Sequence, residues 1–387
     1  MKVGLIRGAY LSQFEMQTYE HLLPEVELEA FKIRINRFNT DIIDVPIKKL
    51  RCIDDPVTML SPKLGFYFNL FLQATNGRDY HHYGLVDALA DKDIAHTMET
   101  FNAFSRQALE AKRKHGCKLV ATVWENRPFA AERFAAKRRM KYEVLAGADL
   151  LLAMSPRAGE CLKLEGADAE RIRVLPPGVN VERFAPREKP EEWLRELGLD
   201  ADDFIFLSVA ALRWEKGIYD LLHAFKKLRM EFPDRPMKLL YAGGGPEKER
   251  LETLARRIGL ESDTRLVRFP YDRMHEGYNL ADAFVLGSCP RPGWLEQFGY
   301  VLPEALASGT PIITTQSGSI PEVVGDCALL CPPSDFLALH EAMRKLLTDR
   351  ELHRRLRETG RDRAEAEYDS RIQAKRLRQA YEEVLHD

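Results

Sequence analysis

The sequence predicts an α/β fold made of two Rossmann-like domains that face each other across a central cleft. Short apolar runs alternate with longer amphipathic stretches along the chain, which is typical of βα units on a mostly parallel sheet. The alternation starts afresh after a charged, proline-bearing stretch, APREKPEEW (185–193). At about 150 residues per domain, the 387 residues suffice for two or three domains, and no motif recurs at the spacing of a solenoid. We therefore expect two similar domains.

Six apolar runs in the first half are the predicted strands of the N-terminal domain. The amphipathic stretches between them are long enough to be crossover helices, which parallel strands require. The predicted strands are KVGLI (2–6), a segment near DIIDVPI (41–47), DIAHT (93–97), KLVATV (118–123), DLLLAM (149–154) and IRVLPPGVN (172–180), the last running into a turn.

The second half shows the same alternation and predicts a second sheet. One of its helices is predicted at IYDLLHAFKKL (218–228), where the apolar residues share one face. The predicted strands are FIFLSVAAL (204–212), KLLYAGG (238–244), LVRFP (266–270), AFVLGS (283–288), TPIITT (310–315) and CALLC (327–331).

Composition and charge exclude several classes of protein. Lys and Arg number 57 against 59 Asp and Glu, so the net charge of −2 lacks the basic excess of a nucleic-acid binder. The six cysteines include no CxxC pair, which predicts reduced thiols instead of a disulfide framework or a zinc site. The N-terminus has no signal-like apolar run, and polar residues interrupt the most apolar stretch (57–74). We therefore expect a cytoplasmic protein.

The segment GWLEQFGYVLPEALASGTPIITT (293–315) has the most residues suited to ligand binding. Pro303 suits the first turn of a helix and Gly309 its exit. The loop 296–301 then leads into a helix N-terminus, whose free N–H groups and dipole favour an anion such as a diphosphate. Glu296 and Glu304 can accept hydrogen bonds from two hydroxyl-bearing parts of one ligand. The same pattern also fits two helix-start carboxylates stabilised by the dipole.

Two other strand ends are candidates for the same site. In AALRWEKGI (210–218), Lys216 lies at a helix start, where a cation is poorly placed unless an anion binds nearby. Arg213 would be a second donor for phosphate oxygens, and a solvated turn with two surface cations is the alternative. In YAGGGPEKERL (241–251), glycines such as Gly244 allow a ligand to approach the backbone, although neither GxGxxG nor a P-loop lysine is present.

Together these segments resemble the nucleotide-sugar domain of the family 4 retaining glycosyltransferases, which have the GT-B fold. The motifs come in the family's order, and Glu296 with Glu304 matches its E-x7-E mark. The first half resembles the family more loosely, through RGAYLSQFE (7–15), DIAHT (93–97) and the long run 148–186. The matching segments of the second half are AALRWEKG, YAGGGPEKERL, YNLADAFVLGSCPRPGWLEQFGYVLPEALASGTPII and SGSIPEVVGDCALLCPP (317–333).

The resemblance implies a role for each matched residue. Glu296 would contact hydroxyls of the donor sugar, and Glu304 would hold the ribose of the nucleotide. Lys216 would neutralise the diphosphate, with Gly8 closing on it from the first domain. The backbone N–H groups that would bind the sugar and the diphosphate are those around Phe298, Gly299, Tyr300 and Val301.

The chain departs from the family pattern at two places. The family usually has an Arg five or six residues before the Lys, where this chain has alanine, so either Arg213 delivers its guanidinium instead or one phosphate contact is lost. The family usually has a sugar-contacting His where this chain has Trp124, so Glu125 or Asn126 is the expected substitute, unless backbone groups alone serve.

Four further features have a functional and a structural interpretation. His96 lies at a predicted strand end, which faces the ligand crevice of a doubly wound sheet, but a buried His that closes a hydrogen bond fits equally. The adjacent histidines of HHYG (81–84) are poorly placed for a shared metal, and no metal site is predicted. The basic helix RFAAKRRMKY (133–142) suits either anionic lipid headgroups or solvent. The aromatic stretch GFYFNLF (65–71) would line an acceptor cleft or pack in the core.

We therefore predict a retaining, metal-independent transfer of a hexose from a UDP- or GDP-linked sugar to a hydroxyl acceptor, with no cofactor. Residues 1–187 would bind the acceptor and 188–370 the nucleotide sugar, and the resemblance implies that the last helix, in 371–387, crosses back onto the first domain. The acceptor would be a sugar, a lipid-linked or a small-molecule hydroxyl, and no nucleic acid is involved.

Several alternatives stay open at this point. A sugar-nucleotide epimerase or hydrolase would use the same fold and the same donor motifs. A non-catalytic nucleotide-sugar-binding subunit of a glycan-assembly complex would explain the missing Arg and His. Weak peripheral contact with the inner face of a membrane is compatible with the basic helix, and the sequence leaves the oligomeric state open.

Overall fold

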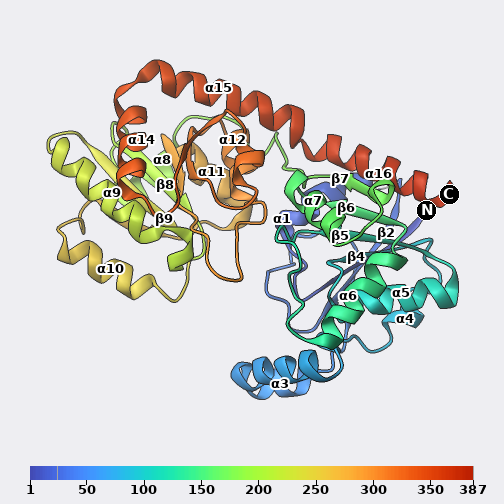
Figure 1. Ribbon diagram of the computed structural model, residues 1–387. Helices are drawn as coiled ribbons and strands as arrows, with labels where there is room; N and C mark the ends of the chain where they lie inside the picture. Colours follow the sequence, from blue (N-terminus) through green and yellow to red (C-terminus); the bar gives the residue numbers. More distant parts are fainter. Residues whose placement is uncertain (24, 387) are drawn as a thin grey trace. The chain divides into compact units, whose positions relative to one another are not determined.

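The computed structural model describes residues 1–23 and 25–386, and it shows two compact α/β units (Figure 1). The N-terminal unit comprises Met1–Gly178 together with the last helix, α16 (Ser370–His386), and the C-terminal unit comprises Val179–Asp369. The chain therefore enters its second unit after Gly178, whereas the sequence placed the boundary after residue 187. Each unit has its own parallel sheet and its own core.

The sheet of the N-terminal unit has seven strands in the order β3-β2-β1-β4-β5-β6-β7, and every neighbouring pair is parallel. Its strands are β1 (Lys2–Gly8), β2 (Glu27–Ile33), β3 (Ile47–Leu50), β4 (Ile94–Met98), β5 (Lys118–Val123), β6 (Leu150–Ala153) and β7 (Ile172–Val174). Its helices, besides α16, are α1 (Gln13–Tyr19), η1 (Glu20–Leu22), α2 (Asp55–Leu60), α3 (Pro62–Thr75), α4 (Leu85–Ala88), α5 (Ala103–His115), α6 (Ala135–Gly147), α7 (Pro156–Leu164) and η2 (Ala169–Arg171).

The sheet of the C-terminal unit has six parallel strands in the order β10-β9-β8-β11-β12-β13. Its strands are β8 (Phe204–Val209), β9 (Met237–Ala242), β10 (Thr264–Val267), β11 (Ala283–Leu286), β12 (Ile312–Thr315) and β13 (Ala328–Cys331). Its helices are α8 (Glu191–Leu197), η3 (Trp214–Lys216), α9 (Ile218–Glu231), α10 (Lys248–Arg257), η4 (Tyr271–Arg273), α11 (Met274–Leu280), α12 (Val301–Ala307), α13 (Ile320–Val324), α14 (Phe336–Thr348) and α15 (Arg350–Glu367).

The sequence prediction was wrong at one strand position. The segment 41–46 forms turns and irregular backbone, and β3 begins only at Ile47. The prediction also missed β2, because charged residues alternate with the apolar ones there and no continuous apolar run is visible. One of them, Glu29, pairs with Lys92 at 3.1 Å. Glu27 and Glu29 share one face of β2 with Phe31, and the opposite face packs on the core through Leu28 and Ala30.

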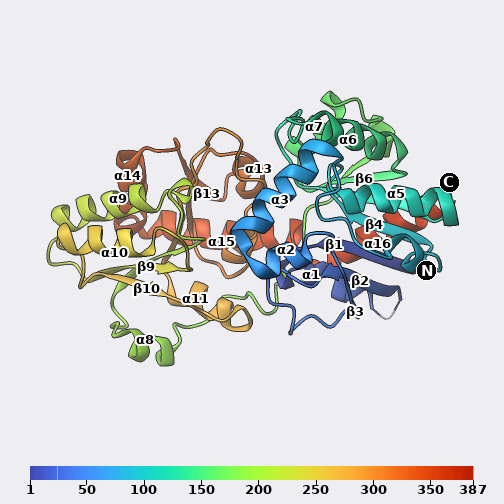
Figure 2. The same cartoon turned by 90° about the horizontal axis from the view of Figure 1, so that it is seen from below.

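Helices pack on both faces of each sheet (Figures 1 and 2). In the C-terminal unit, α9 and α14 lie side by side and form one core with the strands, including Phe225 of α9, Met343 of α14 and Phe206 of β8. In the N-terminal unit, one core lies between the sheet and α5–α7 and another between the sheet and α1 with α16. No helix in the described part of the chain has the length and apolarity to cross a bilayer.

The last helix packs on the N-terminal unit because it carries an apolar stripe. Ala374, Leu377, Tyr381 and Val384 recur at helical spacing and are buried among Leu5 and other residues of that core. The final helix of the chain is therefore part of the first unit.

In each sheet the strand order reverses next to the first strand of the unit. The reversal lies between β1 and β4 in one unit and between β8 and β11 in the other. In open parallel sheets, ligands bind outside the carboxyl ends of the strands at this point of reversal. The loops that follow these strands are therefore where a site is expected.

Candidate functional site

In the C-terminal unit, three candidate loops follow neighbouring strands and so meet at one edge of the sheet. The loop with Arg213 and Lys216 follows β8, the glycine loop around Gly244 follows β9, and the loop that reaches Glu296 follows β11. All three strands are parallel, so their carboxyl ends lie at the same edge. The fold thus brings together segments that are more than 80 residues apart in sequence.

The centre of this edge is an ion pair between Lys216 and Glu296. Lys216 Nζ donates to Glu296 Oε2 at 2.6 Å, and the Ser288 hydroxyl donates to the same oxygen at 2.7 Å. Lys216 Nζ also lies 4.7 Å from the centre of the Trp294 ring, a cation–π geometry. Glu296 is only 7% exposed, so its charge depends on these partners.

Gly217 allows the Lys216 loop to approach β11 this closely. Gly217 has φ +67°, and a Cβ at this position would collide with the carbonyl group of Gly287. A glycine is therefore needed both for the backbone conformation and for the space. The contact continues through the amide of Cys289, which donates to the carbonyl oxygen of Glu215 at 2.8 Å.

Two arginines lie beside this pair, and the sequence predicted one of them. Arg213 Nη1 is 3.8 Å from Glu215 Oε1, and Arg291 Nη2 is 3.6 Å from the same oxygen. The Arg213 side chain is about half exposed, whereas Glu215 is buried. Positive charge from Arg213, Lys216 and Arg291 therefore gathers at this edge. The buried carboxylates of Glu215 and Glu296 offset part of that charge.

The glycine loop packs tightly on the backbone of the β8 loop. A Cβ on Gly243 would collide with the carbonyl oxygen of Ala210, and one on Gly245 with that of Leu212. Gly244 differs, since only Arg268 lies within 4 Å of an added Cβ. Its carbonyl oxygen accepts a hydrogen bond from the Leu212 amide at 2.9 Å. Gly244 therefore supports the β8 loop and leaves open space beside it.

The loop after Glu296 leads into α12, as the sequence predicted. Gly299 has φ +79°, and Tyr300 immediately precedes the first helical residue, Val301. The Phe298 ring is buried and lies 5.9 Å from the Tyr300 ring, centre to centre. The amide of Ser319 donates to the carbonyl oxygen of Glu296 at 3.0 Å. These contacts fix the backbone whose N–H groups were predicted to bind the ligand.

Glu304 lies in the interior of the unit, held by two tyrosines. Its Oε1 accepts a hydrogen bond from Tyr271 at 2.7 Å and its Oε2 one from Tyr278 at 2.8 Å. Glu304 is 2% exposed, and burial raises the pKa of its carboxyl group to about 7. The sequence resemblance implied that Glu304 holds a ribose, but in this structure both carboxylate oxygens already have protein partners.

In the N-terminal unit, Gly8 ends β1 with φ +57°, and a Cβ there would lie 2.6 Å from the Phe104 ring. His96 on the neighbouring β4 is fully buried, and its ring nitrogens are 2.6 Å from the Tyr381 hydroxyl and 2.7 Å from that of Thr122. Burial lowers the pKa of His96 well below its usual value. Of the two interpretations of His96, the structure therefore shows the buried histidine that closes hydrogen bonds. Both ring nitrogens have protein partners, so neither is available to a substrate.

The segment after β5 surrounds a buried acid that the sequence did not single out. The backbone amides of Trp124 and Glu125 donate to Glu99 Oε1 at 2.9 and 3.1 Å. Glu99 has φ +61°, and burial raises the pKa of its carboxyl group to about 8. The Glu125 carboxylate pairs with Arg127 at 2.9 Å, and Asn126 is fully buried. Glu125 and Asn126 therefore serve mainly to order this loop in the structure.

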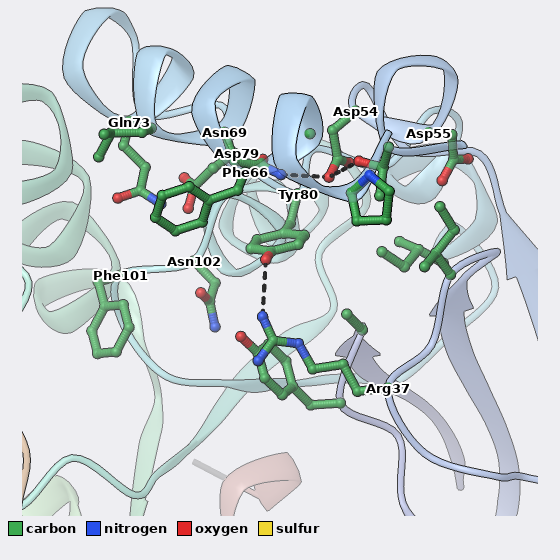
Figure 3. Close-up of a pocket in the computed structure, with 18 of the residues that line it drawn as sticks. Arg37, Asp54, Asp55, Phe66, Asn69, Gln73, Asp79, Tyr80, Phe101 and Asn102 are labelled. Atoms are coloured by element: carbon green, nitrogen blue, oxygen red, sulfur yellow. Dashed lines mark hydrogen bonds between the residues drawn. The ribbon is translucent and has the colours of Figure 1, made fainter. Parts of the chain in front are cut away.

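The N-terminal unit has a cavity of about 480 Å³ at the carboxyl ends of β1, β2 and β4 (Figure 3). Phe66, Asn69 and Gln73 enter it from α3, and Arg37 enters from the opposite side (Figure 3). The Arg37 guanidinium stacks on the Tyr10 ring and donates to the Tyr80 hydroxyl at 3.4 Å. No single stretch of sequence contains this set, which explains why sequence reasoning missed most of it.

Three buried oxygens along this cavity have no hydrogen-bond partner among the described residues: Asp54 Oδ1, Asp55 Oδ1 and Asn69 Oδ1. The second oxygen of Asp54 accepts from Asn69 Nδ2 at 2.6 Å, and that of Asp55 accepts from the Cys52 amide at 2.7 Å. Each of these three side chains is more than nine-tenths buried. An unpaired buried acceptor is costly, so the cavity suits a ligand that supplies hydroxyl donors.

Two family models match the chain, and together they cover most of both units. The model described as Glycosyl transferases group 1 matches residues 189–363, and the model described as Glycosyltransferase Family 4 matches residues 63–183. Each unit of the chain thus matches a glycosyltransferase model over part of the chain. The edge that holds Lys216 and Glu296 lies within the first match, and much of the cavity lies within the second.

The names of the curated relatives of this chain indicate different acceptors. A D-inositol 3-phosphate glycosyltransferase of Corynebacterium jeikeium is 32% identical over 64% of the chain and 61% of the relative. An N-acetyl-alpha-D-glucosaminyl L-malate synthase of Bacillus anthracis is 32% identical over 50% of the chain and 49% of the relative. The chain thus aligns with less than two thirds of the length of these relatives.

Solved structures show the same fold over the whole chain. HepE of Anabaena in complex with UDP is similar with a TM-score of 0.78 and 17% identity, and the match covers 99% of each chain. Sucrose-phosphate synthase of Thermosynechococcus elongatus gives a TM-score of 0.70 with 21% identity, over 100% of this chain and 99% of the other. The predicted GT-B architecture is therefore confirmed.

Proposed function

We propose that the protein is a retaining glycosyltransferase that moves a hexose from a nucleoside diphosphate sugar to a hydroxyl acceptor. The observation that carries the proposal is the Lys216–Glu296 pair at the point where the strand order reverses between β8 and β11. A cation and a carboxylate at this point match the two parts of the donor, its diphosphate and its sugar hydroxyls.

The charges of the site suit a diphosphate. Lys216 takes the phosphate oxygens when the donor binds, and Glu296 accepts hydrogen bonds from the sugar hydroxyls. Arg213 and Arg291 lie beside them and share Glu215 as their carboxylate neighbour. Lysine and arginine donors stabilise the charge that develops on a departing diphosphate. On this basis we propose that the transfer needs no metal.

We infer that the transfer proceeds on one face of the sugar. The bond from the anomeric carbon to the diphosphate breaks while the acceptor oxygen attacks from the same side. The leaving diphosphate oxygen receives the acceptor proton, so no side-chain nucleophile is needed. The positioned cations hold the leaving group where it can accept that proton. For the donor we propose a UDP-sugar, because HepE, which shares the fold, has been solved with UDP and with UDP-glucose.

We infer that the acceptor binds in the cavity of the N-terminal unit. The unpartnered oxygens of Asp54, Asp55 and Asn69 accept hydrogen bonds from its hydroxyl groups, and the Phe66 ring offers an apolar surface to a sugar or cyclitol ring. Arg37 lines the same cavity and has no carboxylate partner in the described part of the chain. An acceptor with a negatively charged group would complement it, as the names of the inositol-phosphate relatives suggest.

The test combines ligand binding with product analysis. Thermal shifts with UDP, GDP, ADP and their sugars identify the donor, because a ligand that binds the folded state raises its stability. Release of nucleoside diphosphate only when an acceptor is added supports transfer. Release without acceptor would indicate a hydrolase, a new sugar nucleotide an epimerase, and binding without any turnover a binding subunit.

Two variants test the site itself. Lys216→Ala and Glu296→Ala should lower the turnover rate about a hundredfold or more, because each removes a group that faces the reacting donor. The matched control is Lys227→Ala, which removes an exposed lysine from α9. Unchanged rates in both site variants would refute the assignment of this edge as the donor site.

A further inference from the structure

Helix α3 differs from an ordinary surface helix because large apolar side chains also occupy its outward face. Its inward face carries Gly65, Asn69 and Leu72, and Asn69 donates to the buried carboxylate of Asp54. Its outward face, at the same helical spacing, carries Leu64, Tyr67 and Phe71. A surface helix of a globular protein normally directs its apolar residues to the core. The aromatic stretch 65–71 is therefore neither a core segment nor only a cavity wall.

The outward side chains of α2 and α3 form one exposed surface, which we call the apolar face. Single exposed apolar residues are common, but several together on adjoining helices mark an interaction surface. Figure 2 shows α2 and α3 following one another along the unit. The residues of the apolar face and their exposed fractions are Met59 (68%), Leu60 (84%), Leu64 (57%), Tyr67 (65%) and Phe71 (59%).

The exposed charges of α2 and α3 are positive, since Asp55 at the start of α2 is buried. Residues 56–78 include no Asp or Glu, and their charged residues are Lys63 and Arg78. Helix α6 packs against α3 and begins in a basic stretch with exposed Arg133, Arg138 and Arg139. Such a border complements an anionic surface. A second copy docked through the same face would bring these cations against each other, which disfavours self-association.

We propose that the apolar face of α2 and α3 docks the protein on an anionic lipid bilayer. The helices lie in the plane of the interface, with Leu60, Leu64 and Phe71 below the headgroups and the arginines of α6 at the phosphate level. Tyr67 suits this depth, because an amphipathic ring has both an apolar body and a polar tip. No spanning helix is needed for such a contact.

Docking through the apolar face would place the cavity of the N-terminal unit next to the bilayer. Gly65, Phe66 and Asn69 of α3 line that cavity, so its wall and the apolar face are two sides of one helix. A headgroup at the bilayer surface would then lie beside the cavity. The docking proposal stands on the exposed face and its charges, and it does not depend on which reaction the protein catalyses.

The first test is flotation of the full chain with vesicles. The protein should bind vesicles of phosphatidylcholine with phosphatidylglycerol, bind pure phosphatidylcholine vesicles more weakly, and lose affinity as salt is raised. In the double variant Tyr67→Glu/Phe71→Glu, each substitution should weaken vesicle binding at least about tenfold. The reason is that burying one aromatic ring in the bilayer strengthens binding by about that factor. The matched control is Leu164→Glu on α7, an equally exposed apolar residue (64%) of the same unit.

The second measurement locates the face. Tryptophan fluorescence of Phe71→Trp should gain a component that brominated lipids quench, whereas Leu164→Trp should not. Melting temperatures of the variants confirm that they fold, which is expected because the substituted side chains are exposed. Absence of vesicle binding by the wild type, or equal loss in the Leu164→Glu control, would overturn the proposal. The proposal would also be overturned if the double variant changed from dimer to monomer while its vesicle binding stayed the same. That result would identify the apolar face as a contact between copies of the chain.

Discussion

The imidazole of His96 and the phenol of Tyr381 are hydrogen-bonded at 2.6 Å, although 285 residues separate them in sequence. The bond connects the central strand β4 to the last helix and lies in a fully buried part of the N-terminal unit. Arg7 lies in the same cluster and donates to Glu15 at 2.7 Å and to the Tyr19 hydroxyl at 2.7 Å. Of the two roles that the sequence allowed for His96, the structure thus shows the buried one, in the contact that holds α16.

Tyr381→Phe should destabilise the protein by about 1 to 3 kcal/mol, because it leaves one nitrogen of His96 buried without a partner. Urea unfolding measures the change in the free energy of unfolding. Tyr83→Phe removes the hydroxyl of an exposed tyrosine and should change the stability little. Equal effects in the two variants would mean that the bond to His96 contributes nothing specific. If His96 bound the substrate instead, its replacement would change the Michaelis constant without changing the stability.

Gly217→Ala should lower the free energy of unfolding far more than a Gly→Ala change at a similar backbone angle elsewhere. Gly198 has φ +62° with open space around it, so Gly198→Ala measures the conformational cost alone, about 1 kcal/mol. Gly217→Ala adds a collision with the Gly287 carbonyl group and should cost about 2 kcal/mol more. It should also weaken nucleotide binding, because Lys216 precedes Gly217 directly. Comparable unfolding free energies for the two variants would contradict the close approach of these loops.

The fold and part of the site were predictable from sequence for a physical reason. Parallel βα units produce an alternation that is visible in any single sequence, and strand ends bring their loops to one edge. Lys216 and Glu296 could be found because each lies in a loop next to a predicted helix start, where a ligand-binding role is one of two interpretations of the pattern. β2 was missed because its charged residues mask an apolar face.

The partners of the predicted residues could not be predicted. Ser288 and Trp294 complete the environment of Glu296 and Lys216, yet neither has a local signal of its own. The cavity of the N-terminal unit is formed by Arg37, Asp54, Asn69 and residues as distant as Lys137, so its chemistry exists only after folding. The two tyrosines on Glu304 come from separate elements, η4 and α11. Only residue contacts in three dimensions reveal such groups.

Glu304→Gln should change how stability depends on pH. The folded carboxyl has a pKa of about 7, above the unfolded value of about 4.3, so the folded state binds more protons between these values. The wild type therefore loses stability from Glu304 as pH rises through this window, and the variant does not. The free energy of unfolding of the variant relative to the wild type should rise with pH, by about 4 kcal/mol at most. Glu249→Gln, at an exposed position, should show no such trend.

Asp55→Asn should weaken acceptor binding without affecting the donor. Asp55 Oδ2 accepts the Cys52 amide at 2.7 Å, and an asparagine carbonyl oxygen can keep that bond. The amide nitrogen would then replace the buried Oδ1, which has no partner among the described residues, so a charged acceptor becomes a neutral donor in a residue that lines the cavity. Because a hydrogen bond to a charged group is worth about 1.5 to 3 kcal/mol, the Michaelis constant for the acceptor should rise about tenfold to a hundredfold. The dissociation constant for the nucleotide, measured by calorimetry, should stay the same, and Asp91→Asn at the exposed end of the unit should change neither quantity. A fall in nucleotide affinity with an unchanged acceptor constant would place the acceptor elsewhere, because the cavity and the Lys216 edge belong to different units of the chain.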